Sequence, residues 1–578
     1  MLQMIVILAV FVALIIPLGT YLYHIAERKH TFADPVFDRV DGVIYKVCGI
    51  NPDKGMNWKK YALSLVLANA VMVFVGYLIL RIQFLPIFNP NGIEGMPADL
   101  SFNTIISFMT NTNLQHYSGE SGLSYLSQML VIIFMMFTSA ASGYAACVAF
   151  VRGLSGRGKD MGNFYADLIR ITTRVLIPLS IIVGLLLVWQ GCPQNLSQNA
   201  TFQTIEGNFQ DMQMGPIASL VSIKHLGTNG GGFLGANSTT PLENPTILTN
   251  MIEMLSMMIL PGACVLMFGK MVRSRKKEKD LRKMKNGQIR TPIFGTEGRT
   301  IFCAMGVIFL IGLAVCYFAE LAGNPALAKV GLNQSMGSME GKEVRFGIAQ
   351  SAMFTTVTTS FTTGTVNNMH DTLTPLGGMI PLLHMMLNLV FGGKGVGLMN
   401  MVMYAILAVF ICGLMIGRTP EYLGKKIEGK EMKLTALCII VHPLLILAFS
   451  AIAVGTAAGL EGITNPGFHG LSQVLYEFSS SAANNGSGFE GLADNTLFWN
   501  VTAGLAMFFG RYISIIIQLA VAASLMRKAP VNESIGTLRT DTPTFTIALI
   551  AVVYIFAALT FFPALSLGPI AEHLTLWG

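Results

Sequence analysis

Long apolar runs separated by shorter polar segments recur along the whole chain of 578 residues. A helix needs about 20 consecutive, mostly apolar residues to cross the hydrocarbon core of a bilayer. Ten runs meet this requirement, at approximately 3–23, 61–81, 125–151, 172–190, 247–270, 300–322, 380–417, 434–457, 495–525 and 544–564. The pattern predicts an all-α polytopic membrane protein with about ten transmembrane helices.

Composition and charge support this prediction. Charged residues make up 12% of the chain, against roughly 25% in an average soluble domain, which excludes an ordinary soluble enzyme. Basic residues gather in five alternate loops, at 28–60, 152–170, 273–290, 418–433 and 527–539. Cationic loops are retained on the cytoplasmic side, so we expect these five loops to face inward and both termini to lie outside. This topology explains the net charge of +7 without nucleic-acid binding. The eight cysteines contain no CxxC and favour neither a disulfide framework nor a zinc site.

Four of the outward segments share an unusual plan, because each contains a short apolar helix followed by small polar residues. The predicted helices are Phe102–Met109, Pro216–Leu226, Ile348–Ser360 and Leu471–Ser481. The polar breaks begin near Asn111, Thr228, Thr362 and Asn484, which are 117, 134 and 122 residues apart. The similar spacing predicts fourfold pseudo-symmetric, channel-like repeats of helix, re-entrant pore helix and helix.

Glycine and small polar residues in the breaks have two interpretations. Asn-Gly and Gly-Gly pairs form simple turns. Four such breaks together favour a different role, because glycine lets successive carbonyls face one axis, and rings of carbonyl oxygens replace the hydration shell of K+ in potassium filters. The predicted filter residues are Asn111, Thr112, Asn113, Thr228, Asn229, Gly230, Thr362, Thr363, Gly364, Asn484, Asn485 and Gly486. Asn113 stands where the other three units have glycine.

Further residues align with these breaks. Ten residues after Gly230, Gly364 and Gly486 come Thr240, Thr374 and Thr496. Acidic side chains also follow the breaks, and a negative outer mouth would concentrate cations, although ordinary solvation explains any single one of them. These acids are Glu120, Glu243, Asp371, Glu490 and Asp494.

Two basic residues lie inside apolar sequence. Arg511 is flanked by apolar residues on both sides, and an intramembrane charge usually faces a cavity or a partner. We expect it to guard the cavity below the filter, although a packed or snorkelling arginine is the alternative. Lys394 lies in Phe391–Gly397, whose four glycines break a run almost twice as long as one span. The broken helix predicts a gate in which Lys394 competes for a cation site, or else a flexible kink.

No source of energy for uphill transport is encoded in this sequence. It contains no GxxxxGK[ST] phosphate loop and no Asp-Lys-Thr-Gly phosphorylation sequence, and the inward loops are too short for a nucleotide-binding domain. Any ATP hydrolysis is therefore expected on a partner.

Several motifs closely resemble the KdpA family, the potassium-binding subunits of bacterial Kdp transporting ATPases. The resemblance covers essentially the whole chain and is carried by Asn111–Asn113, Gly227–Gly232, Val366–Thr372, Ser480–Ser487 and Gly417–Lys426. It implies a channel-like, non-catalytic subunit of the superfamily of potassium transporters in the bacterial cytoplasmic membrane. It also implies a KdpB-like P-type ATPase partner, a single-span KdpC-like subunit and often a small KdpF-like subunit. Potassium, the transported ion, would pass through a tunnel between subunits.

The resemblance also directs attention to gate and tunnel candidates. These are Gln115, Asn388, Gly392, Gly393, Lys394, Gly395 and Arg511. The sequence departs from the family pattern at Asn388, where an acidic residue is frequent, and at Lys394, where an uncharged residue is frequent. Leu114 and Thr363 replace a frequent Trp and Cys.

The expected division of the chain has six parts. An extra span and cytoplasmic loop (1–60) come first, followed by pore repeats at 61–151, 172–270, 300–417 with the broken helix, and 434–525, and an extra span at 544–578. The alternative function is a self-sufficient K+ channel or a Trk/Ktr-type cation symporter, whose four units normally occupy eight spans.

Overall fold

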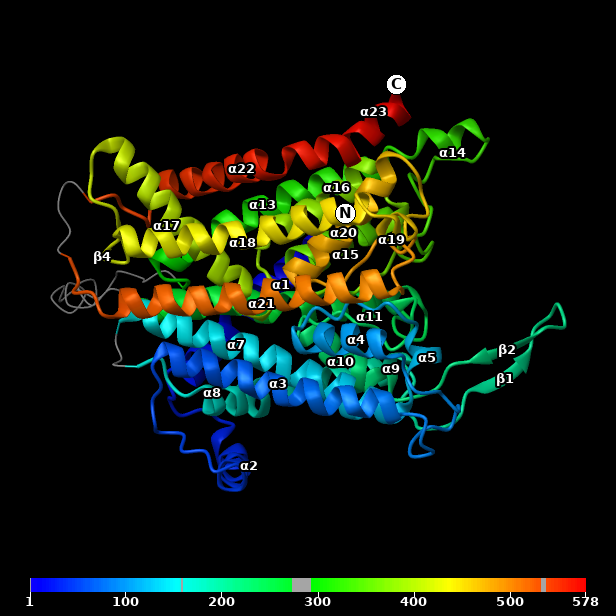
Figure 1. Cartoon of the computed structure of the whole chain (residues 1–578), viewed down its shortest axis with the longest axis horizontal. Helices are drawn as coiled ribbons and strands as arrows, with labels where there is room; N and C mark the ends of the chain where they lie inside the picture. The colour runs from blue at the N-terminus through cyan, green and yellow to red at the C-terminus, as the bar shows by residue number, and fades with distance from the viewer. Residues whose placement is uncertain (1, 157–159, 273–292, 532–536) are drawn as a thin grey trace.

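The computed structural model describes residues 2–156, 160–272, 293–531 and 537–578. Long helices run side by side through the molecule (Figure 1). Ten helical segments in the described ranges have the length and composition of membrane spans: α1 (Leu2–Ala26), α3 (Trp58–Ile82), α6–α7 (Tyr125–Ser155), α8–α9 (Phe164–Gln190), α11 (Ile247–Met271), α13 (Thr296–Leu321), α17 (Val396–Ile416), α18 (Gly429–Val454), α21 (Leu497–Met526) and α22–α23 (Pro543–Trp577). The predicted all-α architecture is confirmed. The basic residues between Arg273 and Arg290, with Arg157 and Lys159, lie outside the described residues.

Four shorter helices lie among the spans at the predicted places. They are α4 (Ala98–Met109), α10 (Ile217–Leu226), α15 (Gly347–Ser360) and α20 (Phe468–Ala483). The remaining elements are small: α2 (Asp34–Val47), α5 (Gly119–Gly122), α14 (Pro325–Lys329), α16 (Pro375–Leu387), α19 (Ala457–Leu460), three 3-10 turns, and two antiparallel pairs, β1 (Ala200–Gln203) with β2 (Phe209–Met212) and β3 (Glu421–Tyr422) with β4 (Lys425–Lys426).

Side-chain caps fix where several helices begin. Thr374, Thr496 and Thr542 each accept a hydrogen bond from a backbone N–H in the first turn of the helix that follows, which satisfies one of the unpaired donors at a helix start. The cap of α11 is Thr246 rather than Thr240. Thr240 therefore does not cap a helix as Thr374 and Thr496 do, because the connection from Gly230 to the cap of α11 is six residues longer than that from Gly364 to the cap of α16.

The seventh apolar run forms two helices. Helix α16 ends where Asn388 takes a left-handed conformation with φ of 47°, and α17 begins at Val396. Between them, Phe391, Lys394 and Gly395 also have positive φ. Pro375 lies in the first turn of α16, where it costs no hydrogen bond.

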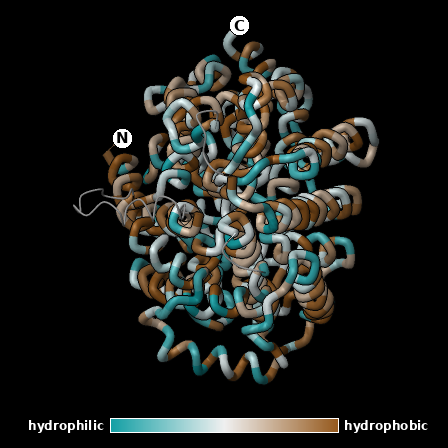
Figure 2. The backbone as a smooth tube through the Cα atoms, turned by 90° about the vertical axis from the view of Figure 1, so that its left-hand side faces the viewer, coloured by the Kyte–Doolittle hydropathy of each residue, from teal (hydrophilic) through white to brown (hydrophobic). Residues whose placement is uncertain are grey.

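Many large apolar side chains are exposed, and hydrophobic stretches run along the helices (Figure 2). On α3, the exposed large side chains include Leu67, Val71, Phe74 and Leu78, which are three or four residues apart and so form one outward stripe. By contrast, serine, threonine and asparagine side chains of the four short helices and their loops are buried. This arrangement is the reverse of that in a soluble protein. It is expected where lipid contacts the outer surface and buried polar groups form hydrogen bonds with one another.

The first span is integrated into the fold. Helix α1 packs along α11. Its Phe11 meets the rings of Phe361 and Phe391 edge to face, with centroids 5.8 and 6.0 Å apart, while those two rings stack at 5.1 Å. Span α1 therefore contacts the break between α16 and α17.

Candidate functional site

The four loops after the short helices share one backbone hydrogen-bond pattern. In each, the second predicted filter residue donates its N–H to the carbonyl five residues earlier, in the last turns of the helix. The pairs are Thr112 to Ser107 (2.9 Å), Asn229 to Lys224 (2.8 Å), Thr363 to Thr358 (2.8 Å) and Asn485 to Ser480 (2.9 Å). The identical offset aligns all four units, including the first, whose sequence matches the others only weakly.

The loops also share an alternation of backbone angles. The first and third predicted filter residues of every unit have positive φ: Asn111 and Asn113 (59° and 60°), Thr228 and Gly230 (48° and 101°), Thr362 and Gly364 (50° and 98°), and Asn484 and Gly486 (55° and 104°). Asparagine tolerates the left-handed region better than most residues, which explains how Asn113 replaces glycine. Alternating hands let successive carbonyls face the same side, as in potassium filters.

The loops contact one another in cyclic order. A side chain on Gly230 would collide with the carbonyl oxygen of Thr363, one on Gly364 with that of Asn485, and one on Gly486 with that of Thr112. The circle closes because the site of a Gly231 side chain lies 3.1 Å from the carbonyl oxygen of Asn113. The four loops therefore surround a common axis with their backbones in contact.

Amide side chains in the loops bind neighbouring units. Asn111 donates to the carbonyl of Thr228 (2.8 Å) and accepts from Asn229 (2.8 Å). Asn484 donates to the Thr112 hydroxyl (3.0 Å), and Asn485 donates to the Thr358 carbonyl (2.9 Å). These side chains brace the circle, which leaves backbone carbonyls as the candidate ligands of an ion.

A buried lysine supports the second loop from behind. Lys224, in α10, forms an ion pair with Glu243 and donates to Asn237 (2.5 Å) and Ser238 (2.9 Å), and Asn237 in turn donates to the carbonyl of Gly230 (2.8 Å). Both charged side chains are fully buried. Lys224 is not among the residues predicted from the sequence, although a lysine within an apolar pore helix is a usable signal. The assignment of Glu243 to an open outer mouth is wrong, because it neutralises this buried cation.

A second buried pair holds α10 against α11. His225 Nδ1 lies 2.8 Å from the carbonyl oxygen of Val221, which can only accept, so Nδ1 carries the hydrogen. The Nε2 atom faces a Glu253 oxygen 3.4 Å away. His225 and Glu253 therefore face each other where α10 meets α11.

The other predicted mouth acids are largely engaged. Glu120 accepts from the N–H of Gly235 (2.6 Å), and Asp371 pairs with His469 (2.9 Å). Asp494 lies 3.8 Å from buried His116. Burial would lower the pKa of His116, but the charge of Asp494 and a hydrogen bond to Glu477 outweigh it and raise the pKa to about 9. Glu490 is exposed and accepts from the N–H of Asp371. The predicted acids therefore do not form a ring of free carboxylates.

The glycine-rich break lies directly against the loops. A side chain on Gly393 would collide with the Thr228 hydroxyl and would lie 2.7 Å from the carbonyl oxygen of Phe361. Gly392 packs against Gly397, and Gly395 against the side chain of Cys147. Only residues without a side chain fit so close to neighbouring backbone. The break thus contacts the second and third units.

Two basic side chains lie at one side of the circle. The Lys394 ammonium donates to the carbonyl oxygen of Asn484 (2.7 Å), and Arg511 donates to the carbonyl of Ser139 (3.4 Å). A side chain on Gly143 would meet both Lys394 and Arg511, so the two lie close together. Both are buried, and no carboxylate pairs with either among the described residues.

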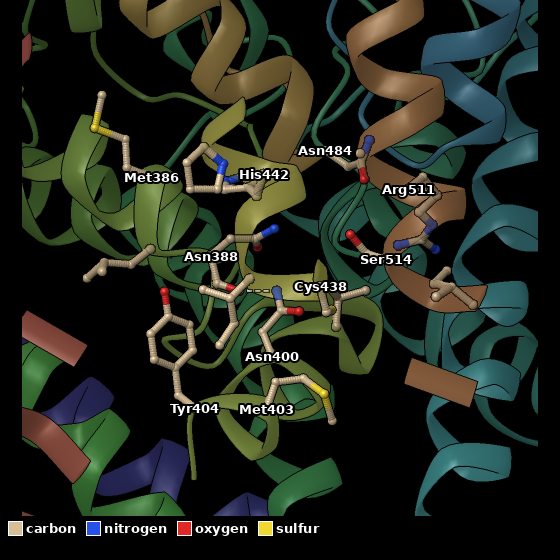
Figure 3. A pocket seen from close by; sticks show the side chains of 16 residues that line it. Met386, Asn388, Asn400, Met403, Tyr404, Cys438, His442, Asn484, Arg511 and Ser514 are labelled. Carbon is tan, nitrogen blue, oxygen red and sulfur yellow. Dashed lines mark hydrogen bonds between the residues drawn. The ribbon is translucent and has the colours of Figure 1, made fainter. Parts of the chain in front are cut away.

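A cavity opens beside Arg511, between α16, α17, α18 and α21. Figure 3 shows Asn388, Asn400, His442, Asn484, Arg511 and Ser514 around it. Asn388 caps α16 and accepts through its carbonyl from Asn400 (2.6 Å). Gln115 lies elsewhere: its side chain donates to the Gly232 carbonyl (3.0 Å) and accepts from the Gly232 N–H (2.8 Å). Of the gate and tunnel candidates, Asn388 and Arg511 line the cavity, and Gln115 links the first and second loops.

Solved structures show the same architecture. The structure of the potassium transporter TrkH from Vibrio parahaemolyticus aligns with a TM-score of 0.50 over 78% of this chain and 83% of that one, at 14% sequence identity. At this identity the likeness concerns the fold alone.

Comparison with known sequences is more specific. The family model described as potassium-transporting ATPase A subunit matches residues 5–574. Proteins named potassium-transporting ATPase potassium-binding subunit are 58% identical over 575 residues in Clostridium acetobutylicum, covering 100% of both chains, and 54% identical over 575 residues in Geobacillus kaustophilus, covering 99% of both. With the four aligned loops, these matches show that the chain belongs to the family of A subunits of potassium-transporting ATPases.

Proposed function

We propose that this chain selects K+ at the circle of four loops and passes it toward an ATP-hydrolysing partner. The observation that supports it is the shared loop backbone, with the same hydrogen-bond offset and alternating φ in every unit. The proposed ligands are backbone oxygens of Asn111–Asn113, Thr228–Gly230, Thr362–Gly364 and Asn484–Gly486. The proposed repeats, 61–151, 172–270, 300–417 and 434–525, supply one loop each.

The path below the loops runs sideways in this proposal. Arg511 places a positive charge beside the axis, next to Lys394, and like charges in a water-poor interior repel strongly. A cation leaving the circle avoids this charge and enters the cavity lined by Asn388 and Ser514. The proposed partners are a KdpB-like ATPase subunit at the end of this path, with KdpC-like and KdpF-like subunits.

The test is purification of the tagged chain from its native membrane. We expect an ATPase to accompany it and to hydrolyse ATP faster when K+, but not Na+, is added. Isolation of the chain alone, with K+ flux driven by an ion gradient in vesicles, would instead support the symporter alternative.

A second test concerns orientation. The proposal places both termini outside and the basic segment 418–433 inside, which includes Lys430 in the first turn of α18. In a variant with the exposed Cys48 and Cys303 replaced by serine, a cysteine at Gly578 should react with an impermeant thiol reagent in intact cells. A cysteine at Lys430 should react only after permeabilisation. Reaction of Lys430→Cys in sealed cells would refute this topology.

A further inference from the structure

Helix α2 lies crosswise to the spans at the edge of the bundle. It is seen nearly along its axis in Figure 1, while in Figure 2 it crosses the lower edge. The helix follows α1 and precedes α3 in the chain. It therefore connects two spans without entering the bundle.

One face of α2 is fixed to the protein by charge. Arg174, which is fully buried, pairs with Asp34 (3.1 Å), Asp38 and Asp41. These aspartates are four and three residues apart, so they share one face of the helix. Burial would raise the pKa of Asp34, but hydrogen bonds from Thr31 and Arg174 outweigh it and lower the pKa to about 2. The ionised face therefore sets the rotation of α2 about its axis.

The opposite face of α2 is apolar and uncovered. Phe32, just before the helix, and four valines have exposed fractions of 85% (Phe32), 64% (Val36), 45% (Val40), 63% (Val43) and 79% (Val47). The intervals of four, four, three and four residues place them in one line, here termed the valine stripe. Exposed Arg39 and Lys46 are the basic residues of the helix.

The position of Arg174 shows what surrounds the valine stripe. It lies near the start of the apolar part of the α8–α9 span, whose exposed residues include Ile181, Ile182 and Leu185. Helix α2 reaches this depth to pair with Arg174, so its outward face continues the lipid-facing surface of α9. It also lies at the edge of the bundle opposite α18 and α22 (Figure 1), away from the cavity of Figure 3.

We propose that α2 is an interfacial membrane helix whose valine stripe inserts into the cytoplasmic leaflet, among the acyl chains next to the headgroups. An amphipathic helix in the membrane plane buries its apolar face at this depth, with basic side chains toward the phosphates. Arg39 and Lys46 fit that headgroup layer. The inference goes beyond ion selection, because it assigns a lipid contact to a segment that touches neither the loops nor the cavity.

The test uses spin labels on the complete complex in phosphatidylcholine–phosphatidylglycerol vesicles. Cysteines replace Val36, Val40 or Val43 in a chain with Cys48 and Cys303 changed to serine, and Asn51→Cys, in the exposed loop after α2, is the matched control. We expect labels on the stripe to collide severalfold more with oxygen than with a water-soluble nickel chelate, and the label at Asn51 to show the reverse.

Two outcomes would overturn the proposal. Nickel accessibility on the stripe equal to that at Asn51 would place it in water. Protection from both reagents would mean that a protein partner covers it. All three positions are exposed, so the substitutions leave the packing of the bundle intact, and K+-stimulated ATP hydrolysis of each labelled complex reports its integrity.

Discussion

Gly230→Asp is expected to lower the K+ affinity of the complex and to admit smaller cations. Gly230 has φ of 101°, and the carbonyl oxygen of Thr363 occupies the place of any side chain. A substitution must therefore displace the second or third loop. Backbone strain of this kind costs about 1–3 kcal/mol, which corresponds to a loss of roughly 5- to 150-fold in binding. The measurement is K+ and Na+ dependence of ATP hydrolysis by the purified complex.

Gly488→Asp is the matched control for this experiment. Gly488 follows the fourth loop, its φ is not left-handed, and a side chain there would meet open space. The same charge is added near the same circle without backbone conflict, so K+ affinity should stay close to that of the unmodified complex. Unchanged affinity and selectivity in Gly230→Asp would refute the placement of the ion axis among these four loops.

Arg511→Met should uncouple transport from ATP hydrolysis. The arginine is buried beside Lys394 at the cavity, and its Nη1 atom has no hydrogen-bond partner. A unit charge about 4 Å from a cation contributes on the order of 4 kcal/mol at an effective dielectric constant of 20. Its removal lowers the barrier toward the cytoplasm, while methionine keeps the approximate length and packs in an apolar surrounding. We expect fewer K+ ions transported per ATP in vesicles, with a passive K+ leak.

The control for this charge lies on the same helix. Arg527 caps the end of α21 and is exposed, so Arg527→Met removes one positive charge of the subunit without changing the cavity. Transport per ATP in Arg527→Met should match that of the unmodified complex. If Arg511→Met transports as many K+ ions per ATP as the unmodified complex and shows no passive leak, the role of Arg511 is purely structural.

The spans and short helices could be predicted from local patterns. Apolar length determines a membrane span, and a helix followed by small polar residues marks each loop. The circle itself depends on contacts between units more than a hundred residues apart, such as Gly486 with Thr112. Spacing along the chain indicated that the units are alike but carried no information on how they pack together.

Side-chain partners explain the predictions that failed. In the sequence, Glu243 stands among polar loop residues like an acid exposed to solvent. Its partner Lys224 is brought next to it only by the fold. The count of ten residues that suggested Thr240 assumed equal loop lengths, but the connection after the second loop reaches its helix cap six residues later, at Thr246. Lys394 was expected to compete at a cation site, and its ammonium does reach a loop carbonyl, that of Asn484. The glycines on either side of Lys394 do not predict which of the four loops its side chain contacts.

One chain carries all four loops, so each sector of the circle can diverge by itself. In a symmetric tetramer every substitution recurs in all four subunits. Any sideways exit route for the ion is then present four times. Here, Asn113 differs from its three glycine counterparts, and Lys394 donates its side-chain hydrogen bond to the fourth loop. A mutation in this chain therefore alters only one of the four loops. Evolution can thus make one side of the pore the exit for K+ while the four loops at the entrance remain nearly equivalent.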